Sequence, residues 1–167
     1  VGIPAFQFGI FSEKDLGFHA GPTFNFGGRV HTNGNLFLAV GSGNYLTISD
    51  KVTAVGEVIR THNPNGRPIA DGGWTGNVRL LTTAGGSTYR NLATNEASLV
   101  GTLGSAKNEP KWTNISLSTY HGMIRNGRTG ARRLDLPIVA VGYQPIELIR
   151  RPAPGETTAA PVFPQRY

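Results

Sequence analysis

Histidine is the first residue type in this chain that could do chemistry, because imidazole binds metals and exchanges protons near neutral pH. A metal site needs several nitrogen, oxygen or sulfur ligands that converge on one point. None of the histidines has an H-x-H or H-x-x-x-H spacing, and His31 falls on an expected outward strand position. We predict no metal site and expect structural or surface roles for all four: His19, His31, His62 and His121.

Carboxylates are the second candidate, since paired Asp and Glu side chains cleave polysaccharides by acid–base catalysis. They are sparse, with ten in 167 residues, and only Glu13 and Asp15 lie close in sequence, in an expected turn. Pairs can come from distant strands, so spacing alone leaves this class open. The chain contains no cysteine, no G-x-G-x-x-G, no P-loop and no G-x-S-x-G pattern. We predict a non-enzymatic protein without catalytic residues or cofactors.

Basic residues are the third candidate, because guanidinium groups bind phosphates and sugar carboxylates. The densest window, residues 125–133, has no aromatic platform for stacking bases, so we do not expect nucleic acid as a partner. A glycine-rich exposed hairpin is the simpler interpretation of this window. Carbohydrate binding by Trp74 with Arg67 or Arg79 is an alternative. The residues predicted for polyanion or glycan contact are Arg125, Arg128, Arg132, Arg133 and Trp74.

The elements that must position these side chains are predicted to be strands. Glycine supplies 23 of 167 residues and charged residues only 16%, and Thr, Asn and β-branched residues outweigh strong helix formers. The length fits one domain with a sizeable core. A net charge of +6 favours polyanionic partners, although the basic residues are scattered.

Neither a membrane span nor a signal sequence is recognisable. No stretch approaches the ~20 apolar residues that a membrane-spanning helix needs. No basic segment followed by an apolar one opens the chain. Because the chain begins at Val1 without an initiator Met, we interpret it as a processed protein or a segment of a longer one.

An internal repeat organises the first half of the chain. Residues 23–38 align without gaps on residues 45–60, an offset of 22 residues that places Val30 on Val52. Two strand-rich units at this spacing are typical of successive coils of a β-solenoid. We expect the following side chains to form buried columns: Phe24, Phe26, Val30, Leu36, Leu46, Ile48, Val52 and Val58.

The rest of the chain shows weaker patterns. Residues 76–81 form a degenerate third copy that is expected to stack Val78 under Val52, after a loop at 61–75. Residues 89–100 are the only expected helical turns. Apolar spacing predicts further strands around Trp112, Ile115, Leu117 and Tyr120, at 134–141 and at 145–149. One domain therefore spans residues 1–150, and residues 151–167, which are rich in proline, form an extended tail.

The segments FNFGGRVHTNGNLFL (24–38), LTISDKVTAVGEVIR (46–60) and GARRLDLPIVAVGYQPIELIRRP (130–152) carry a resemblance. They resemble the β-helical region of bacterial surface proteins that have a PilX-type pilus-assembly segment, over residues 6–152. More distantly, the stacked units are similar to bactofilin-type polymerising solenoids. The resemblance implies an extracellular or cell-surface structural role and brings no catalytic residues.

Together these patterns predict an all-β fold, a right-handed β-solenoid with irregular loops, with a β-sandwich as the alternative. The predicted function is that of a surface- or pilus-associated structural protein that self-associates into an oligomer or filament through its open ends. A carbohydrate-binding or polysaccharide-cleaving domain is the alternative. The predicted subunit contacts are Phe6, Phe8, Ile10, Val162 and Phe163.

Overall fold

The computed structural model describes residues 9–135 of the chain. The chain divides into two compact units, and the described elements belong to the one formed by Phe6–Arg133. Several predictions fall outside the described residues: the contacts Phe6, Phe8, Val162 and Phe163, most of the strand at 134–141, the strand at 145–149 and the tail at 151–167.

Four short strands form a parallel sheet in the order β1–β4–β6–β12. They are β1 (Ile10–Ser12), β4 (Val30–Thr32), β6 (Val52–Ala54) and β12 (Ile124–Arg125). Ile10, Val30, Val52 and Ile124 are successive partners across this sheet. The last three are at most 1% exposed, so this row of β-branched side chains forms one wall of the core.

The second sheet has eight strands and mixes two orientations. Its strands are β2 (Leu16–Ala20), β3 (Phe24–Phe26), β5 (Leu36–Ile48), β7 (Val58–Ile59), β8 (Thr75–Leu81), β9 (Tyr89–Asn91), β10 (Leu99–Val100) and β11 (Ala106–Lys107). The pairs that involve β5, and the pair β7–β10, are parallel. The pairs β8–β9 and β10–β11 are antiparallel.

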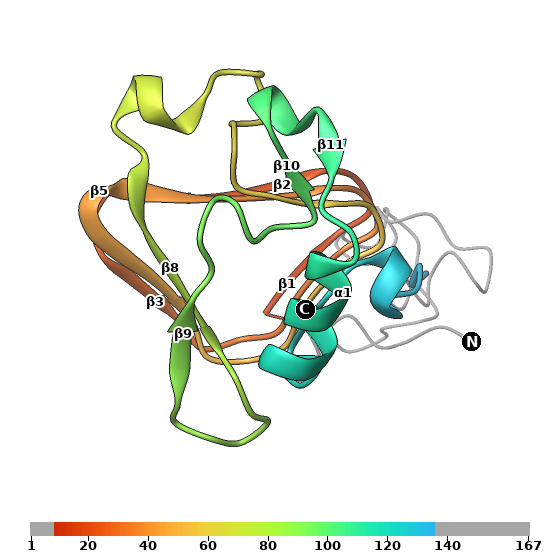
Figure 1. The fold of residues 1–167 in the computed structure, drawn as a ribbon. Coiled ribbons are helices and arrows are strands. Elements are labelled where there is room, and N and C mark those ends of the chain that lie inside the picture. The colour runs from red at the N-terminus through yellow and green to blue at the C-terminus, as the bar shows by residue number, and fades with distance from the viewer. Residues whose placement is uncertain (1–8, 136–167) are drawn as a thin grey trace, which may run out of the picture. The chain divides into compact units, whose positions relative to one another are not determined.

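The long strand β5 curls this sheet around the core (Figure 1). Its first half pairs with β2 and β7, and its second half pairs with β3 and β8. The bend passes through Gly41, where an added Cβ would lie 2.2 Å from the carbonyl oxygen of Gly21. Glycine is therefore required at this corner, because no side chain fits between the two backbones.

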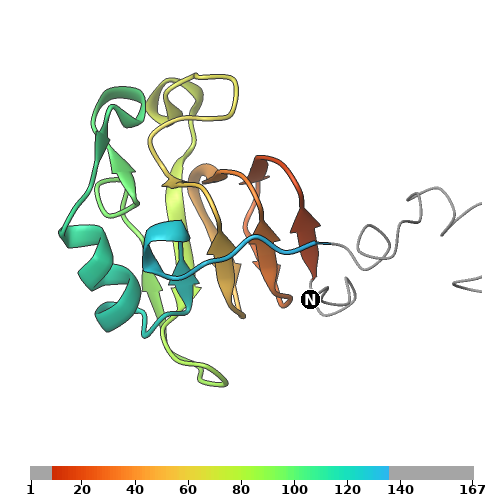
Figure 2. The same cartoon turned by 90° about the vertical axis from the view of Figure 1, so that its right-hand side faces the viewer.

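The 22-residue offset is the register between neighbouring strands. Val30 pairs with Val52, Leu36 with Val58 and Phe24 with Leu46. Figure 2 shows the resulting layers side by side. The expected place of Val78 was wrong: Val78 pairs with Leu46, while the further neighbour of Val52 is Ile124. The loop at 61–75 brings the chain back beside the second half of β5 instead of beside β6.

The predicted fold class, all-β with a β-solenoid or a β-sandwich, is wrong. The sheets combine parallel and antiparallel pairs, the larger sheet is curled, and helical segments complete the structure, so the fold is mixed. The helical segments are α1 (Lys111–Asn114), a π-helical turn (Ile115–Thr119) and 3-10 turns at Ile69–Gly72, Thr102–Gly104 and Gly127–Thr129. Regular coils do not continue beyond the repeat because antiparallel hairpins and α1 come after it.

The helical segment lies where a strand was expected, at residues 111–119. Trp112, Ile115 and Tyr120 are buried, whereas Leu117 is 43% exposed. Trp112, Ile115 and Tyr120 stand at positions i, i+3 and i+8, which lie on one face of a helix. A strand with Ile115 facing inward would also bury Leu117. The expectation for residues 89–100 was also wrong, since this segment contains β9 and β10 and no helix.

Candidate functional site

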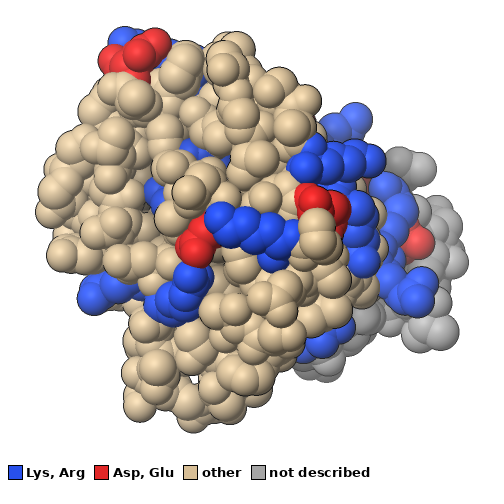
Figure 3. Space-filling view, viewed as in Figure 1, with Lys and Arg blue, Asp and Glu red and all other residues tan. Residues whose placement is uncertain are grey.

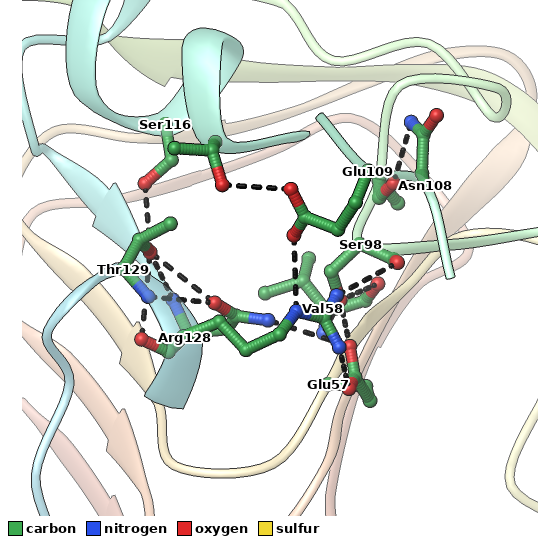
Figure 4. A network of polar contacts seen from close by, with 11 residues as sticks. Glu57, Val58, Ser98, Asn108, Glu109, Ser116, Arg128 and Thr129 are labelled. Atoms are coloured by element: carbon green, nitrogen blue, oxygen red, sulfur yellow. Dashed lines mark hydrogen bonds and ion pairs between the residues drawn. The ribbon is translucent and has the colours of Figure 1, made fainter. Parts of the chain in front are cut away.

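A group of linked polar side chains joins three distant parts of the chain (Figure 4). At its centre the Arg128 guanidinium contacts the carboxylates of Glu57 and Glu109, the latter at 3.0 Å from Nε. Arg128 Nη2 also donates to the carbonyl oxygen of Ser98 at 3.2 Å. One cation thus connects the residues just before β7, β10 and α1 by charge-assisted hydrogen bonds.

Local sequence explains why Arg128 reaches this position. The 3-10 turn Gly127–Thr129 follows β12, and the side-chain oxygen of Asn126 accepts a hydrogen bond from the Thr129 backbone N–H at 3.2 Å. Thr129 Oγ1 in turn accepts from the Asn126 N–H at 2.9 Å. This reciprocal cap fixes the turn and so directs the Arg128 side chain toward both glutamates.

A serine beside a carboxylate in this network could be taken for a nucleophile. The Ser98 hydroxyl donates to Glu57 Oε2 at 2.6 Å and accepts from the Val58 N–H, also at 2.6 Å. Ser98 is fully buried, however, and its hydroxyl is occupied by a backbone partner. A nucleophilic serine needs an adjacent general base and access to substrate. The geometry assigns Ser98 to holding β7 in place.

The carboxylate of Glu109 in this network stays ionised. Burial alone raises the pKa of Glu109, but hydrogen bonds from Thr113 and Arg128 outweigh it and hold that pKa below its ordinary value. A second pair behaves alike: the Arg90 guanidinium lies 2.6 Å from Glu96 Oε1, and the pKa of Glu96 is lowered despite burial. Both groups are suited to structural ion pairs, and neither carries a proton for acid catalysis near neutral pH.

The predicted basic contacts do not converge on one site. Arg128 is bound to two glutamates, and half-buried Arg125 donates to the carbonyl oxygen of Gly122 at 3.0 Å. Arg132 and Arg133 are exposed, and Arg133 lines an open depression with Glu13, Lys14 and Asp15. Figure 3 likewise shows acidic side chains among the basic ones on that face. The charges around this window are mixed.

Trp74 lies at the end of the loop that precedes β8. Its ring packs against His19 with 5.7 Å between centroids, and it is half-buried. Arg67 in the same loop donates to the carbonyl oxygen of Asp71. Arg79 instead lies over the ring of Tyr45. The expected combination of Trp74 with Arg79 is therefore not formed, since Trp74 packs on His19 and Arg79 on Tyr45.

The histidines are spread over the fold. His31, expected to point outward, is 1% exposed, and its Nε2 lies 2.8 Å from Asn33 Oδ1. Within residues 9–135 no three His, Asp or Glu side chains are grouped so that they could hold a metal ion. In the same part of the chain, no helix has the length and apolar character to cross a membrane.

The candidate functional site is the open end of the second sheet, which we define as β2, β3 and the turn between them. Among residues 9–135 each of these strands pairs only with β5, so its other edge has no strand partner. The Leu16 N–H donates to the carbonyl oxygen of Asn35. Since N–H groups alternate along a strand, those of Gly17 and His19 point away from β5.

The open end also leaves apolar side chains of the core exposed. Phe24, expected in a buried column, is 46% exposed although its partner Leu46 is fully buried. Phe18 packs against Phe24 and Phe26, with ring centroids 6.3 and 5.4 Å apart. A shallow apolar depression lies here, lined by Gly17, Phe18, His19, Ala20, Pro22 and Phe24.

The sequence contains a pattern that could have indicated this end. Ile10 pairs with Val30, Leu16 with Leu36 and Phe18 with Leu38, each at an offset of 20 residues. A search at that offset would have found a further unit before residue 23. Of the predicted subunit contacts that are described, Ile10 belongs to this first layer and packs against the core.

Comparisons with known proteins add no identification. Protein-family models give no match to this chain, and neither curated proteins nor solved structures give one. The resemblance to the β-helical region of PilX-type surface proteins therefore stays a prediction.

Proposed function

We propose that this protein is a non-enzymatic structural protein that self-associates through the open end. One observation carries the proposal: β2 and β3 each have an edge without a strand partner among residues 9–135, and the core layer beside them is partly exposed. A strand edge presents N–H and C=O groups that another chain can pair with. Burying Phe24 at the same place would add a hydrophobic contribution.

The partner that fits this end best is a second copy of the same chain, joined through the same surface. At the other end of the sheet the core is covered, since Trp112, Ile115 and Tyr120 are at most 5% exposed. The edge strands there are short, three residues in β9 and two in β11, and Lys107 on β11 is exposed, which disfavours pairing. One accessible end within residues 9–135 supports a closed dimer with twofold symmetry rather than a filament.

A location outside the cell or at its surface belongs to the same proposal. It rests on the resemblance of residues 24–60 and 130–152 to bacterial surface proteins. A dimerising module of this kind would join two chains without changing any substrate.

The proposal is tested by sedimentation velocity on the full chain, with Phe24→Lys as the variant and Leu103→Lys as its control. Leu103 is a good match because it is 47% exposed, against 46% for Phe24, and lies beyond β10. We expect a dimer for the parent and the control, and at least tenfold weaker association, about 1.4 kcal/mol, for Phe24→Lys. A parent that stays monomeric, or a control that dissociates equally, would refute the proposal.

A further inference from the structure

A row of polar side chains crosses the outer side of the second sheet. Asn25, Thr47, Arg79 and Asn91 are successive partners across β3, β5, β8 and β9. Their neighbours along β5 and β8, Leu46 and the other core residues, are buried. Because side chains alternate along a strand, the row points away from the core.

Arg79 is the only charged member of the row and is held in a fixed orientation. Its guanidinium lies 4.4 Å from the centroid of the Tyr45 ring, and its Nε donates to Thr47 Oγ1 at 3.2 Å. Among the described residues no carboxylate pairs with it. Stacking on the Tyr45 ring orients the plane of the guanidinium group. Neither Nη atom of Arg79 has a hydrogen-bond acceptor within residues 9–135.

Two exposed tyrosines flank Arg79 on the same outer side. Tyr45 is 40% exposed and pairs with Asn77, two residues before Arg79 on β8. Tyr89 is 37% exposed and pairs with Leu81, two residues after Arg79. The Tyr89 hydroxyl donates to Ser49 Oγ at 3.1 Å, which fixes that ring. Exposed aromatic rings held in place provide flat apolar platforms beside polar groups. We call these residues, with the row above, the tyrosine–arginine face.

The charge of this face selects the ligand class. The outward positions of the four strands hold Arg79 and no Asp or Glu. On β3, the second half of β5, β8 and β9 they are Asn25, Tyr45, Thr47, Thr75, Asn77, Arg79, Leu81, Tyr89 and Asn91. Thr23 and Ser49 flank β3 and β5, and Leu81 is only 3% exposed. A guanidinium fork with accessible Nη atoms matches a carboxylate in two parallel hydrogen bonds. Amide and hydroxyl groups around it match sugar hydroxyls, and the tyrosine rings match the apolar faces of sugar rings.

We propose that the tyrosine–arginine face binds an acidic polysaccharide whose sugar units carry carboxylates. Neighbouring strands lie about 4.8 Å apart, which is close to the length of one sugar unit in an extended chain. A polysaccharide that crosses β3, β5, β8 and β9 therefore meets one polar side chain per unit. Its carboxylate pairs with Arg79, and sugar rings stack on Tyr45 and Tyr89. The face shares Asn25 of β3 with the open end, but its charged contact does not depend on self-association, because Arg79 lies on β8.

The test is isothermal titration of the full chain with polygalacturonate and, separately, with its methyl ester, which has the same sugar backbone without the charge. We expect binding to polygalacturonate that weakens with added salt, and at least tenfold weaker binding to the ester. Arg79→Gln should lower the affinity for polygalacturonate at least tenfold, and Tyr45→Ala should lower it as well. Lys107→Gln, which removes an exposed charge on β11, should leave the affinity unchanged.

Three outcomes would overturn the inference: no binding of polygalacturonate by the parent, equal binding of the ester, or full affinity in Arg79→Gln. Thermal unfolding of each variant is measured alongside, since Arg79 covers Thr47. If Arg79→Gln unfolds more easily, Arg79→Lys provides the second test, because it keeps the charge and loses the planar fork. The lysine variant should then bind polygalacturonate more weakly than the parent and more tightly than the glutamine variant, and any other order would overturn the inference.

Discussion

Single side chains in this protein connect backbone segments that are far apart in sequence. Arg60 is 3% exposed and donates to the carbonyl oxygens of Leu38 and Gly76, at 3.4 and 3.0 Å, and also to that of Leu92. Burial lowers its pKa to about 10, which still leaves it charged at neutral pH. The repeat aligns Arg60 with apolar Leu38, so a buried cation could not be expected here from the sequence. Its partners are backbone carbonyl oxygens, which every residue type has, so the sequence does not indicate them.

Protonation of the buried His31 is linked to folding. Its ring stacks on Phe11, and its Nδ1 lies 2.7 Å from Thr53 Oγ1. Burial lowers its pKa below the ordinary 6.5, and the hydrogen bond with Asn33 offsets only part of this effect. The unfolded chain therefore takes up a proton at a higher pH than the folded chain.

We predict that stability falls as the solution is acidified below pH 6.5. The contribution of His31 is fully present above that pH and is lost as the pH falls through the lower pKa of the folded state. Urea unfolding at a series of pH values measures this slope. His31→Gln should reduce the slope below pH 6.5. An equal slope in the parent and His31→Gln would contradict the prediction.

At the scale of elements, the sequence predicted pairing better than it predicted architecture. Residues aligned at an offset of 22 are strand partners, because in-register parallel pairing places equivalent apolar residues side by side. The same alignment could not predict the elements after residue 60. α1 begins at Lys111, where the apolar spacing indicates an alternating strand. The observed burial does not follow that alternation, because Leu117 is exposed and Ser116 is buried. Short helical segments are stabilised by tertiary packing, which a local pattern does not contain.

The row of β-branched residues across the first sheet yields a prediction at this scale. Val52 is 1% exposed between Val30 and Ile124, so Val52→Asp places an uncompensated charge in the core. We expect a loss of about 3–5 kcal/mol of unfolding free energy, enough to unfold a domain of ordinary stability. Circular dichroism during thermal denaturation measures the loss. Thr88→Asp adds the same charge at an exposed position and should melt like the parent, and a Val52→Asp variant that did so would disprove the stacked row.

At the scale of the whole molecule, the two ends of the layered core differ. One end is covered by Trp112, Ile115 and Tyr120, and the other presents Phe24 beside the edges of β2 and β3 that have no strand partner among residues 9–135. The sequence predicted that an end would mediate contacts, and it placed Ile10 among them. It did not predict which of the two ends is covered. One end is covered because residues 92–120 fold over it. The repeat at residues 23–60 does not predict where those later residues pack.

The tyrosine–arginine face likewise could not be predicted in full. The sequence suggests Arg79 as a companion of Trp74, but its neighbours Tyr45 and Asn91 come from strands 34 and 12 residues away, as the differences 79 − 45 and 91 − 79 show. Only the register of β5, β8 and β9 brings them together. The contributing residues are common types without a distinctive spacing, so no motif marks them.

The most direct test of the central claim, self-association through the open end, is a distance measurement between spin labels in the dimer. The chain has no cysteine, so one introduced cysteine gives one label per copy. Gly21→Cys places the label in the turn between β2 and β3, where an added Cβ meets no atom within 4 Å, and Ser105→Cys places it before β11 at the other end. We predict a shorter distance between copies for position 21 than for position 105. The reverse order, or no dipolar coupling at either position, would contradict the claim.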